Sequence, residues 1–319
     1  MKDKIVFLDS STVDYGDIDF SGLREFGEVV VYPVTAPGEV AERCKDATIV
    51  ITNKVVFGSD LISQCPNLKM IAEAATGYNN IDIDEAKRRG IIVANVPGYS
   101  TTTVAQLTMA FILSLSTNLI KYNAAAHDGT WCRSDIFTLG TWPFFDLEGK
   151  TVGIMGLGAI GGEVARLCSA FRMNVVALKR DDNSGGGTYP RVGLYDLAKE
   201  SDFISVHMPL TEYSKGLING EFFSNMKKTA FLINMARGPI VDPAALKEAL
   251  VEGRIAGAAI DVMEKEPPDA DDPLLNTPDL IITPHIAWAS IESRRRLVNE
   301  ITENIGAFRK GEKRNVVNG

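Results

Sequence analysis

The stretch Thr151–Gly162, TVGIMGLGAIGG, decides the fold. Its apolar run, residues 152–155, meets glycines with the spacing GxGxxG, and a helix-compatible stretch follows. In this context Gly156 permits a tight turn, Gly158 lets the backbone approach a pyrophosphate, and Gly161 lets the helix pack closely on the strand. The sequence therefore predicts a dinucleotide site with the pyrophosphate at a helix N-terminus. The alternative interpretation is a purely structural glycine turn.

Length and composition describe a chain of 319 residues with 45% hydrophobic and 23% charged residues, a formal net charge of −8 and a pI of about 5.1. Because one core rarely grows past about 250–300 residues, we expect two domains. The acidic balance argues against nucleic acid or an anionic membrane as the main partner, and no run approaches the roughly 18 apolar residues of a membrane helix. Four scattered cysteines without a CxxC pair argue against a metal site and favour a reducing, cytoplasmic setting.

Short apolar runs alternate with helix-compatible stretches, which predicts parallel α/β sheets. The first series ends near Pro97-Gly98 and the second begins at Thr151. Between them, residues 101–123 predict one long helix, and the aromatic-rich residues 127–146 predict a capping loop or a dimer arm. Residues 184–187 are expected to form a flexible loop. The expected strands are residues 4–8, 29–32, 47–51, 68–72 and 91–94 in the first series, and 152–155, 175–178, 203–207, 230–234, 257–261 and 280–283 in the second. The expected helices are residues 38–44, 83–89, 162–171, 194–198, 220–225, 243–252 and 291–310.

A basic pair, Lys179-Arg180, follows the second strand of the nucleotide-binding series. An acidic residue at this point would bind the ribose 2′-hydroxyl of NAD, whereas a cation suits the 2′-phosphate of NADP. The pair therefore favours NADP over NAD as the cofactor. The alternative is a solvated basic pair that the following Asp181-Asp182 partly neutralises.

Further candidate site residues also follow predicted strands. Arg237 stands after one strand, and its planar guanidinium matches a carboxylate bidentately. His285 follows the last strand, where it can shuttle a proton with the help of a nearby carboxylate. Asp261 closes another strand and Glu266 comes shortly after it. His207 also ends a strand, and its position fits a catalytic role less well than that of His285, since it could equally be packed.

Ordered sequence blocks cover nearly the whole chain, and together they resemble the D-isomer-specific 2-hydroxyacid dehydrogenases, particularly the glycerate dehydrogenase/hydroxypyruvate reductase group. Each block alone is weak evidence for the family, but the blocks in this order are specific to it. The blocks are ATGYNNIDIDEAKRRGIIVANVPG at 75–98, GLGAIG at 156–161, HMPLT at 207–211, INMARGPIVD at 233–242, AAIDVMEKEPP at 258–268 and TPHIAWAS at 283–290.

The resemblance implies a Rossmann-type dinucleotide-binding domain, residues 99–287, inserted into a smaller flavodoxin-like substrate-binding domain, residues 1–98 and 288–319. It also implies a homodimer formed through the nucleotide domain. The implied activity is the NAD(P)-dependent reduction of a small 2-oxo acid, similar to hydroxypyruvate or glyoxylate, to the D-2-hydroxy acid. No metal is implied.

Roles for single residues follow from the same resemblance. Arg237 is implied to bind the substrate carboxylate and carbonyl, and His285 is implied to be the acid/base with Glu266 as its partner. Asp261 is implied to bind the nicotinamide carboxamide. The implied cofactor-binding residues are Gly156, Gly158, Ala159, Ile160, Gly161, Lys179, Arg180, His207, Met208, Pro209, Met235, Ala236, Arg237, Asp261, His285 and Ala287. The implied substrate-binding residues are Asn53, Lys54, Thr76, Gly77, Tyr78, Arg237, His285 and Trp288.

Two departures from the family pattern stand out. Lys179 lies where NAD-dependent members carry Asp, and Gln106 lies where a Glu is usual. Three alternatives stay open: a dehydrogenase for a larger or branched D-2-hydroxy acid, a formate-type dehydrogenase, and a dinucleotide-sensing co-regulator with weak activity. Glu266 argues against the formate type, because those enzymes move no proton and pair the histidine with Gln.

Overall fold

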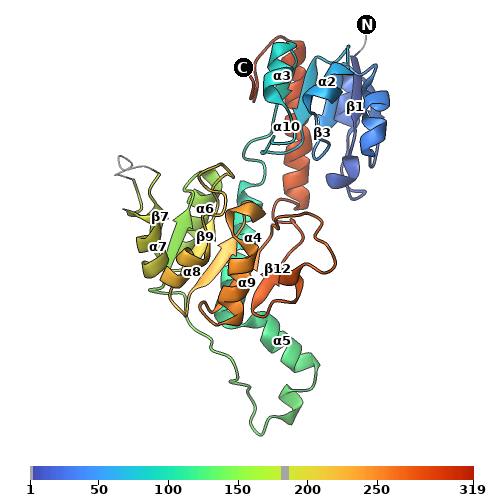
Figure 1. The fold of residues 1–319 in the computed structure, drawn as a ribbon. Coiled ribbons are helices and arrows are strands. Elements are labelled where there is room, and N and C mark those ends of the chain that lie inside the picture. The colour runs from blue at the N-terminus through green and yellow to red at the C-terminus, as the bar shows by residue number, and fades with distance from the viewer. Residues whose placement is uncertain (1–2, 181–186) are drawn as a thin grey trace. The chain divides into compact units, whose positions relative to one another are not determined.

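The computed structural model describes residues 3–180 and 187–319 and divides into two compact units (Figure 1). The first unit comprises Met1–Ser100 together with Ala289–Gly319, and the second comprises Thr101–Trp288. The second unit is therefore an insertion into the first, and its limits lie within two residues of those expected from the sequence. Most of the loop expected at 184–187 lies outside the described residues.

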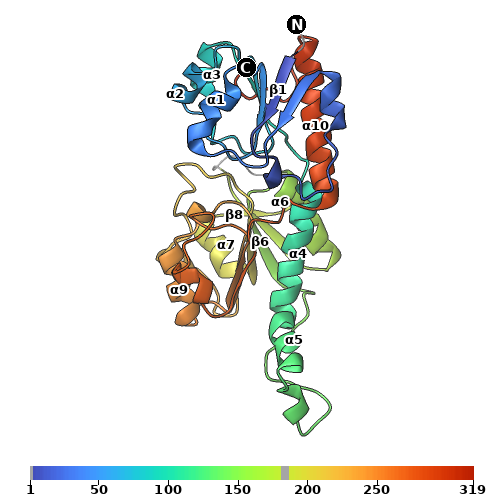
Figure 2. The same ribbon diagram turned by 90° about the vertical axis from the view of Figure 1, so that its right-hand side faces the viewer.

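The first unit is built on a five-stranded parallel sheet with the order β2-β1-β3-β4-β5. This order is that of flavodoxin-like folds, as the family resemblance implied. Figure 2 shows α1, α2 and α3 on one side of the sheet and α10 on the other. The strands are β1 (Asp3–Phe7), β2 (Gly27–Val31), β3 (Ile49–Thr52), β4 (Met70–Glu73) and β5 (Ile92–Ala94), and the helices are α1 (Val40–Cys44), α2 (Ser59–Ser63), α3 (Ile83–Arg88) and α10 (Ile291–Arg309).

The second unit is built on a seven-stranded parallel sheet with the order β12-β11-β10-β9-β6-β7-β8. The order reverses between β6 and β9, which gives the doubly wound Rossmann pattern and places its switch point there. Buried apolar clusters cover both faces of the sheet. The strands are β6 (Thr151–Met155), β7 (Asn174–Leu178), β8 (Arg191–Val192), β9 (Phe203–Val206), β10 (Phe231–Asn234), β11 (Gly257–Ile260) and β12 (Leu280–Ile282). The helices are α4 (Thr101–Thr117), α5 (Leu119–His127), α6 (Ala159–Ala170), α7 (Leu194–Glu200), α8 (Gly220–Asn225) and α9 (Pro243–Val251).

The prediction of one helix over 101–123 is wrong. The chain forms α4 and α5, which meet at a bend of 63°. Asn118 between them adopts the left-handed conformation with φ 50°, which asparagine tolerates better than most side chains, and its Nδ2 donates a hydrogen bond to the Pro143 carbonyl oxygen at 2.6 Å. In the described part of the chain no single helix is long and apolar enough to cross a membrane. The bent pair α4 and α5 has the length and the apolar composition of a membrane-crossing segment only when the two helices are counted together.

Smaller differences concern element ends and short elements. Helix α6 begins at Ala159 rather than Gly162, because Gly158 is already its N-cap residue. Helix α2 and strand β8 were not predicted. Strand β8 has only two residues and is defined by its pairing with β7. The local sequence has no apolar pattern that would predict this pairing.

Candidate active site

The glycine turn after β6 has the geometry of a phosphate cradle. At Gly156, φ is +101° and a Cβ would lie 2.6 Å from the Met208 amide nitrogen, while at Gly161 a Cβ would lie 2.1 Å from the Gly156 carbonyl oxygen. Neither position can therefore hold a side chain without a backbone shift. Gly158, by contrast, has open space around its Cβ position, and no side chain caps the helix that begins at Ala159. Its first N–H groups fit a pyrophosphate.

The predicted residues 207–209 lie beside this turn, because β6 and β9 are neighbours. The His207 amide nitrogen donates to the Met155 carbonyl oxygen at 2.7 Å, and Met208 is the residue against which Gly156 packs. The His207 ring bonds through Nε2 to Ser205 Oγ at 2.8 Å, whereas Nδ1 is buried without a hydrogen-bond partner among the described residues. Burial lowers the pKa of His207 to about 3, so its ring is neutral. This neutral state does not suit a proton donor.

The basic pair predicted to select the cofactor follows β7. Lys179 is exposed, and its amide nitrogen donates to the Val192 carbonyl oxygen at 2.9 Å. Arg180 is also exposed. The structure adds Arg191 on β8, whose Nη1 donates to the Leu178 carbonyl oxygen at 3.3 Å at the end of β7. Sequence reasoning missed this third cation, since only the β7–β8 pairing brings it there.

Arg237 stands in a tightly packed turn after β10. The Asn234 side chain orders this turn: its Nδ2 donates to the Arg237 carbonyl oxygen at 3.0 Å and its Oδ1 accepts from the Ala236 amide at 3.1 Å. At Gly238 a Cβ would lie 2.1 Å from the Met263 carbonyl carbon, so this turn touches the segment that leads to the predicted acid/base partner. The guanidinium itself is exposed, with Nη1 donating to the Ala236 carbonyl oxygen at 2.7 Å.

His285 and Glu266 form a hydrogen-bonded pair. His285 Nδ1 and Glu266 Oε2 are 2.6 Å apart, and their side chains are 28% and 34% exposed, so both can meet a ligand. Glu266 Oε1 also accepts from the Met263 amide at 2.9 Å, which fixes the carboxylate. The pair leaves His285 Nε2 as the ring nitrogen that can reach a substrate. Trp288, three residues on, is half-buried.

Asp261 holds the segment that carries His285. The Asp261 side chain is buried, and its Oδ1 accepts from Thr283 Oγ1 at 2.5 Å and from the Ile286 amide at 2.9 Å. Its Oδ2 accepts from the Ala287 amide at 2.9 Å. Burial raises the pKa of Asp261, and these hydrogen bonds oppose the rise. The nicotinamide contact expected of Asp261 stays a prediction.

The loops predicted to bind substrate in the first unit are also held by neighbouring side chains. The Asp9 carboxylate accepts from the amides of Asn53 at 3.0 Å and Lys54 at 2.7 Å. In the other loop, Asn95 Nδ2 donates to the Thr76 carbonyl oxygen at 2.7 Å. Sequence reasoning missed Asp9, because it lies 45 residues before Lys54.

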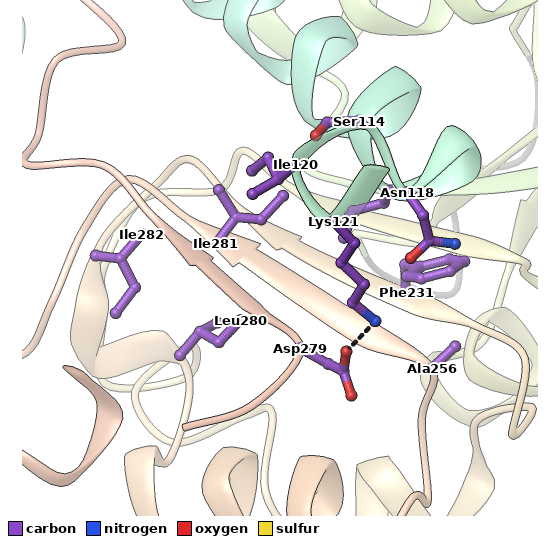
Figure 3. Close-up of a pocket in the computed structure, with 11 residues that line it drawn as sticks. Ser114, Asn118, Ile120, Lys121, Phe231, Ala256, Asp279, Leu280, Ile281 and Ile282 are labelled. Atoms are coloured by element: carbon purple, nitrogen blue, oxygen red, sulfur yellow. Dashed lines mark ion pairs between the residues drawn. The ribbon is translucent and has the colours of Figure 1, made fainter. Parts of the chain in front are cut away.

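A separate cavity of about 380 Å³ lies at the opposite, amino-terminal edge of the second unit's strands. Lys121 on α5 and Asp279 before β12 form an ion pair across it at 2.5 Å (Figure 3). It contains none of the predicted site residues. Over residues 3–180 and 187–319, no group of three or more His, Cys, Asp or Glu side chains could hold a metal ion.

Fold and site together define the class of protein. A glycine cradle at the switch point of a doubly wound sheet is typical of dinucleotide binding. The histidine–carboxylate pair and Arg237 follow strands at the carboxyl-terminal edge of the same sheet, where such folds bind their ligands. Residues 109–287 match the family model of the D-isomer specific 2-hydroxyacid dehydrogenase, NAD binding domain.

Comparison with whole proteins agrees with the family model. The chain is 38% identical to a hydroxypyruvate reductase of Blautia hydrogenotrophica and 38% identical to a glycerate dehydrogenase of Methylorubrum extorquens, with 99% of both chains covered in each case. It also matches the crystal structure of an NADPH-dependent glyoxylate/hydroxypyruvate reductase from Sinorhizobium meliloti in complex with NADP and malonate, with a TM-score of 0.84, 29% identity, and 99% of this chain and 97% of that chain covered. The chain belongs to the D-isomer-specific 2-hydroxyacid dehydrogenase family and is a nicotinamide-dinucleotide-dependent oxidoreductase.

Proposed function

We propose that this enzyme reduces a small 2-oxo acid of the hydroxypyruvate or glyoxylate type to the D-2-hydroxy acid, with NADP favoured over NAD. The observation that carries the proposal is the 2.6 Å contact between His285 Nδ1 and Glu266 Oε2. A carboxylate on Nδ1 fixes the orientation of the ring and leaves Nε2 as the nitrogen that exchanges a proton with the substrate. Formate oxidation moves no proton, so this pair supports chemistry on a carbonyl or hydroxyl group.

The residues of the second unit have separate roles in the reduction. A bound nicotinamide dinucleotide supplies the hydride. His285 donates the proton on Nε2 to the carbonyl oxygen of the substrate, and Glu266 stabilises the imidazolium that donates it. Arg237 binds the substrate carboxylate through its planar guanidinium, and its charge favours the negative charge that develops on the carbonyl oxygen. In the reverse direction neutral His285 accepts the hydroxyl proton.

The substrate class is supported by the relatives. Two of the full-length matches act, by their names, as a hydroxypyruvate reductase and a glycerate dehydrogenase, and others are glyoxylate reductases. Binding of the substrate carboxylate by the 76–78 loop stays a prediction from the resemblance.

A rate panel tests the proposal. Hydroxypyruvate, glyoxylate, pyruvate and a branched 2-oxo acid are each offered with NADH and NADPH, and cofactor oxidation is followed by absorbance. We expect kcat/KM for hydroxypyruvate or glyoxylate to exceed that for the branched acid by at least about tenfold, because one misplaced methylene in a pocket already costs about 1–3 kcal/mol. A faster branched acid would make the enzyme a dehydrogenase for larger substrates. No oxidation with any acid would favour the co-regulator.

Cofactor preference has its own test in Lys179→Asp. Removing a cation from the 2′-phosphate and adding a like charge should lower the ratio of NADPH to NADH affinity by about tenfold or more, because a hydrogen bond to a charged group contributes about 1.5–3 kcal/mol. Fluorescence titration of both cofactors measures the ratio. Lys228→Asp is the matched control, since Lys228 is exposed in the same unit just before β10. An unchanged ratio in the Lys179 variant would refute the 2′-phosphate assignment.

A further inference from the structure

Three neighbouring strands of the first unit end in a buried row of polar side chains. Asp9 follows β1, Thr52 ends β3 and Glu73 ends β4, and these side chains are 5%, 0% and 0% exposed. Thr52 and Glu73 are partners in the strand register. The loops predicted to bind substrate, at 53–54 and 76–78, leave the sheet from this same edge. The mechanism above makes no use of Glu73.

Asp9 and Glu73 differ in their hydrogen bonds. The Asp9 carboxylate receives the amides of Asn53 and Lys54. Glu73 receives only the Asn80 side chain, with Nδ2 at 3.2 Å from Oε2, and its Oε1 is buried without a hydrogen-bond partner among the described residues. A buried carboxylate needs several donors to stay ionised, whereas a protonated acid does not. The site of Asp9 therefore suits an anion and the site of Glu73 suits a neutral acid.

The charged groups around Glu73 agree with this difference. Those that act on it in the described structure are Asp9, from the end of β1, and Lys54, from the loop after β3. Burial, the largest cause, and the Asp9 carboxylate raise the pKa of Glu73 to about 9, although Asn80 and Lys54 oppose the rise. Burial also raises the pKa of Asp9, against the effect of its amide donors. Glu73 is thus protonated at neutral pH.

Through Asn80, Glu73 connects the two predicted substrate loops. The Asn80 side chain donates not only to Glu73 but also to the Val55 carbonyl oxygen at 3.1 Å. The Asn80 carbonyl oxygen in turn accepts from the Phe57 amide at 2.8 Å. Glu73 and Asn80 stand at the two ends of the segment that contains residues 76–78, so contacts to both ends determine its shape.

We propose that Glu73 is a positioning residue for an anionic substrate: as a neutral acid it holds Asn80 and the 76–78 loop without placing a second negative charge beside Asp9. The proposal rests on the proposed function, since that function makes the substrate a carboxylate. Ionisation of Glu73 would repel such an anion. It would leave the His285 proton transfer untouched, so binding should change while kcat does not.

Binding of oxamate, a 2-oxo acid analogue that is not reduced, tests this. Its dissociation constant for the NADPH-loaded enzyme is measured from pH 6 to pH 10 by nicotinamide fluorescence, with wild type, Glu73→Gln and the control Glu28→Gln. Glu28 is exposed on β2 of the same sheet. We expect wild type and Glu73→Gln to agree within twofold at pH 7, and wild type to bind at least threefold more weakly than Glu73→Gln at pH 10. Other groups that change with pH affect both proteins alike and cancel in the ratio, and Glu28→Gln should follow wild type.

The protonation itself is tested without substrate. The folded pKa of Glu73 is raised above the unfolded value, so the stability contributed by its proton is complete below the unfolded pKa and is lost as pH rises through about 9. The thermal midpoint of wild type should therefore fall relative to Glu73→Gln as pH rises over this range. A constant difference would show that Glu73 is already ionised and would overturn the proposal.

The outcomes separate this proposal from the proposed function. If the rate panel succeeds and the oxamate ratio is the same at pH 7 and pH 10, the role of Glu73 is refuted alone. If the panel fails while the ratio changes as expected, the reduction reaction is refuted and the role of Glu73 in anion binding stands. A matching loss in kcat for Glu73→Gln at pH 7 would also refute a role confined to positioning.

Discussion

His285 has a left-handed backbone conformation, with φ 53°, which is uncommon for residues other than glycine. The surrounding hydrogen bonds maintain it: the His285 amide donates to the carbonyl oxygens of Asp261 and Thr283, both at 2.9 Å, and the Asp261 carboxylate holds the residues on either side. Strain of this sort persists only where the neighbourhood enforces it, and it is concentrated at functional sites. Here it accompanies the contact between His285 and Glu266.

Replacement of the partner carboxylate should slow the proton transfer. In Glu266→Gln the acceptor that holds His285 Nδ1 at 2.6 Å and stabilises the imidazolium is lost, so kcat/KM for 2-oxo acid reduction should fall by at least about tenfold. Steady-state rates with hydroxypyruvate and NADPH measure the loss. Glu264→Gln, two residues away and exposed, should keep the wild-type rate. A wild-type rate in Glu266→Gln would exclude this residue from the acid/base pair.

Residues in motifs could be predicted from the sequence, and residues that support them could not. Arg237, Glu266 and His285 could be singled out as candidates because each follows a strand within a recognisable block, and the structure places His285 and Glu266 in contact. Glu73 and Arg191 belong to no recognisable motif, because the fold determines their surroundings. Arg191 reaches the end of β7 only through the β7–β8 pairing. Glu73 lies near Asp9, 64 residues earlier, and accepts from the Asn80 side chain in the loop after β4.

At the scale of elements, α6 shows how close backbone contact fixes a site. The adjacent glycines Gly161 and Gly162 differ in surroundings, since a Cβ at Gly161 would meet the Gly156 carbonyl oxygen at 2.1 Å whereas a Cβ at Gly162 would meet nothing within 4 Å. Gly161→Ala should therefore lower the unfolding free energy of the nucleotide domain by about 1–3 kcal/mol, as overpacking does. It should also weaken NADPH binding.

The neighbouring position supplies the control for that prediction. Gly162→Ala should stabilise α6 by up to about 1 kcal/mol, because alanine is the better helix former. Urea unfolding measures the free energy of unfolding of both variants, and titration measures their affinity for NADPH. Equal effects at the two positions would mean that the close approach of α6 to the glycine turn does not matter.

Strands were predicted more reliably than the long helix. Parallel strands such as β3 and β9 are buried on both faces and read as continuous apolar runs, which the sequence displays directly. The break between α4 and α5 depends on one residue, Asn118, and on its contact with Pro143. The apolar pattern on both sides of this residue is helical, so it gave no sign of the break.

At the scale of the whole molecule, the apolar side chains exposed on α5 and on the segment that follows it predict a dimer. Large apolar side chains exposed close together along the chain often mark a surface that meets a partner. Five such side chains are Leu119, Ile120, Trp131, Phe137 and Phe144, each at least 50% exposed. Sedimentation velocity should give about twice the 34.6 kDa chain mass, as expected of an isologous interface.

A variant of the most exposed of these side chains tests the interface. The substitution Phe137→Asp places a charge at a side chain that is 91% exposed. The dimer of this variant should dissociate at protein concentrations at which the wild type is still dimeric. Val34→Asp introduces the same charge at an exposed apolar position of the first unit and should leave the dimer intact. A monomeric wild type, or a Phe137→Asp protein as dimeric as wild type, would contradict the prediction.

The central claim, proton donation by His285 during reduction of a 2-oxo acid, is tested most directly by His285→Ala. NADPH oxidation with hydroxypyruvate at saturating cofactor should fall by about 10²–10⁴-fold, the usual contribution of a general acid, while the NADPH dissociation constant changes less than about threefold, within the scatter of a neutral substitution. His127→Ala, an exposed histidine at the end of α5, should match wild type in both measurements. A His285→Ala enzyme with wild-type turnover would contradict the account.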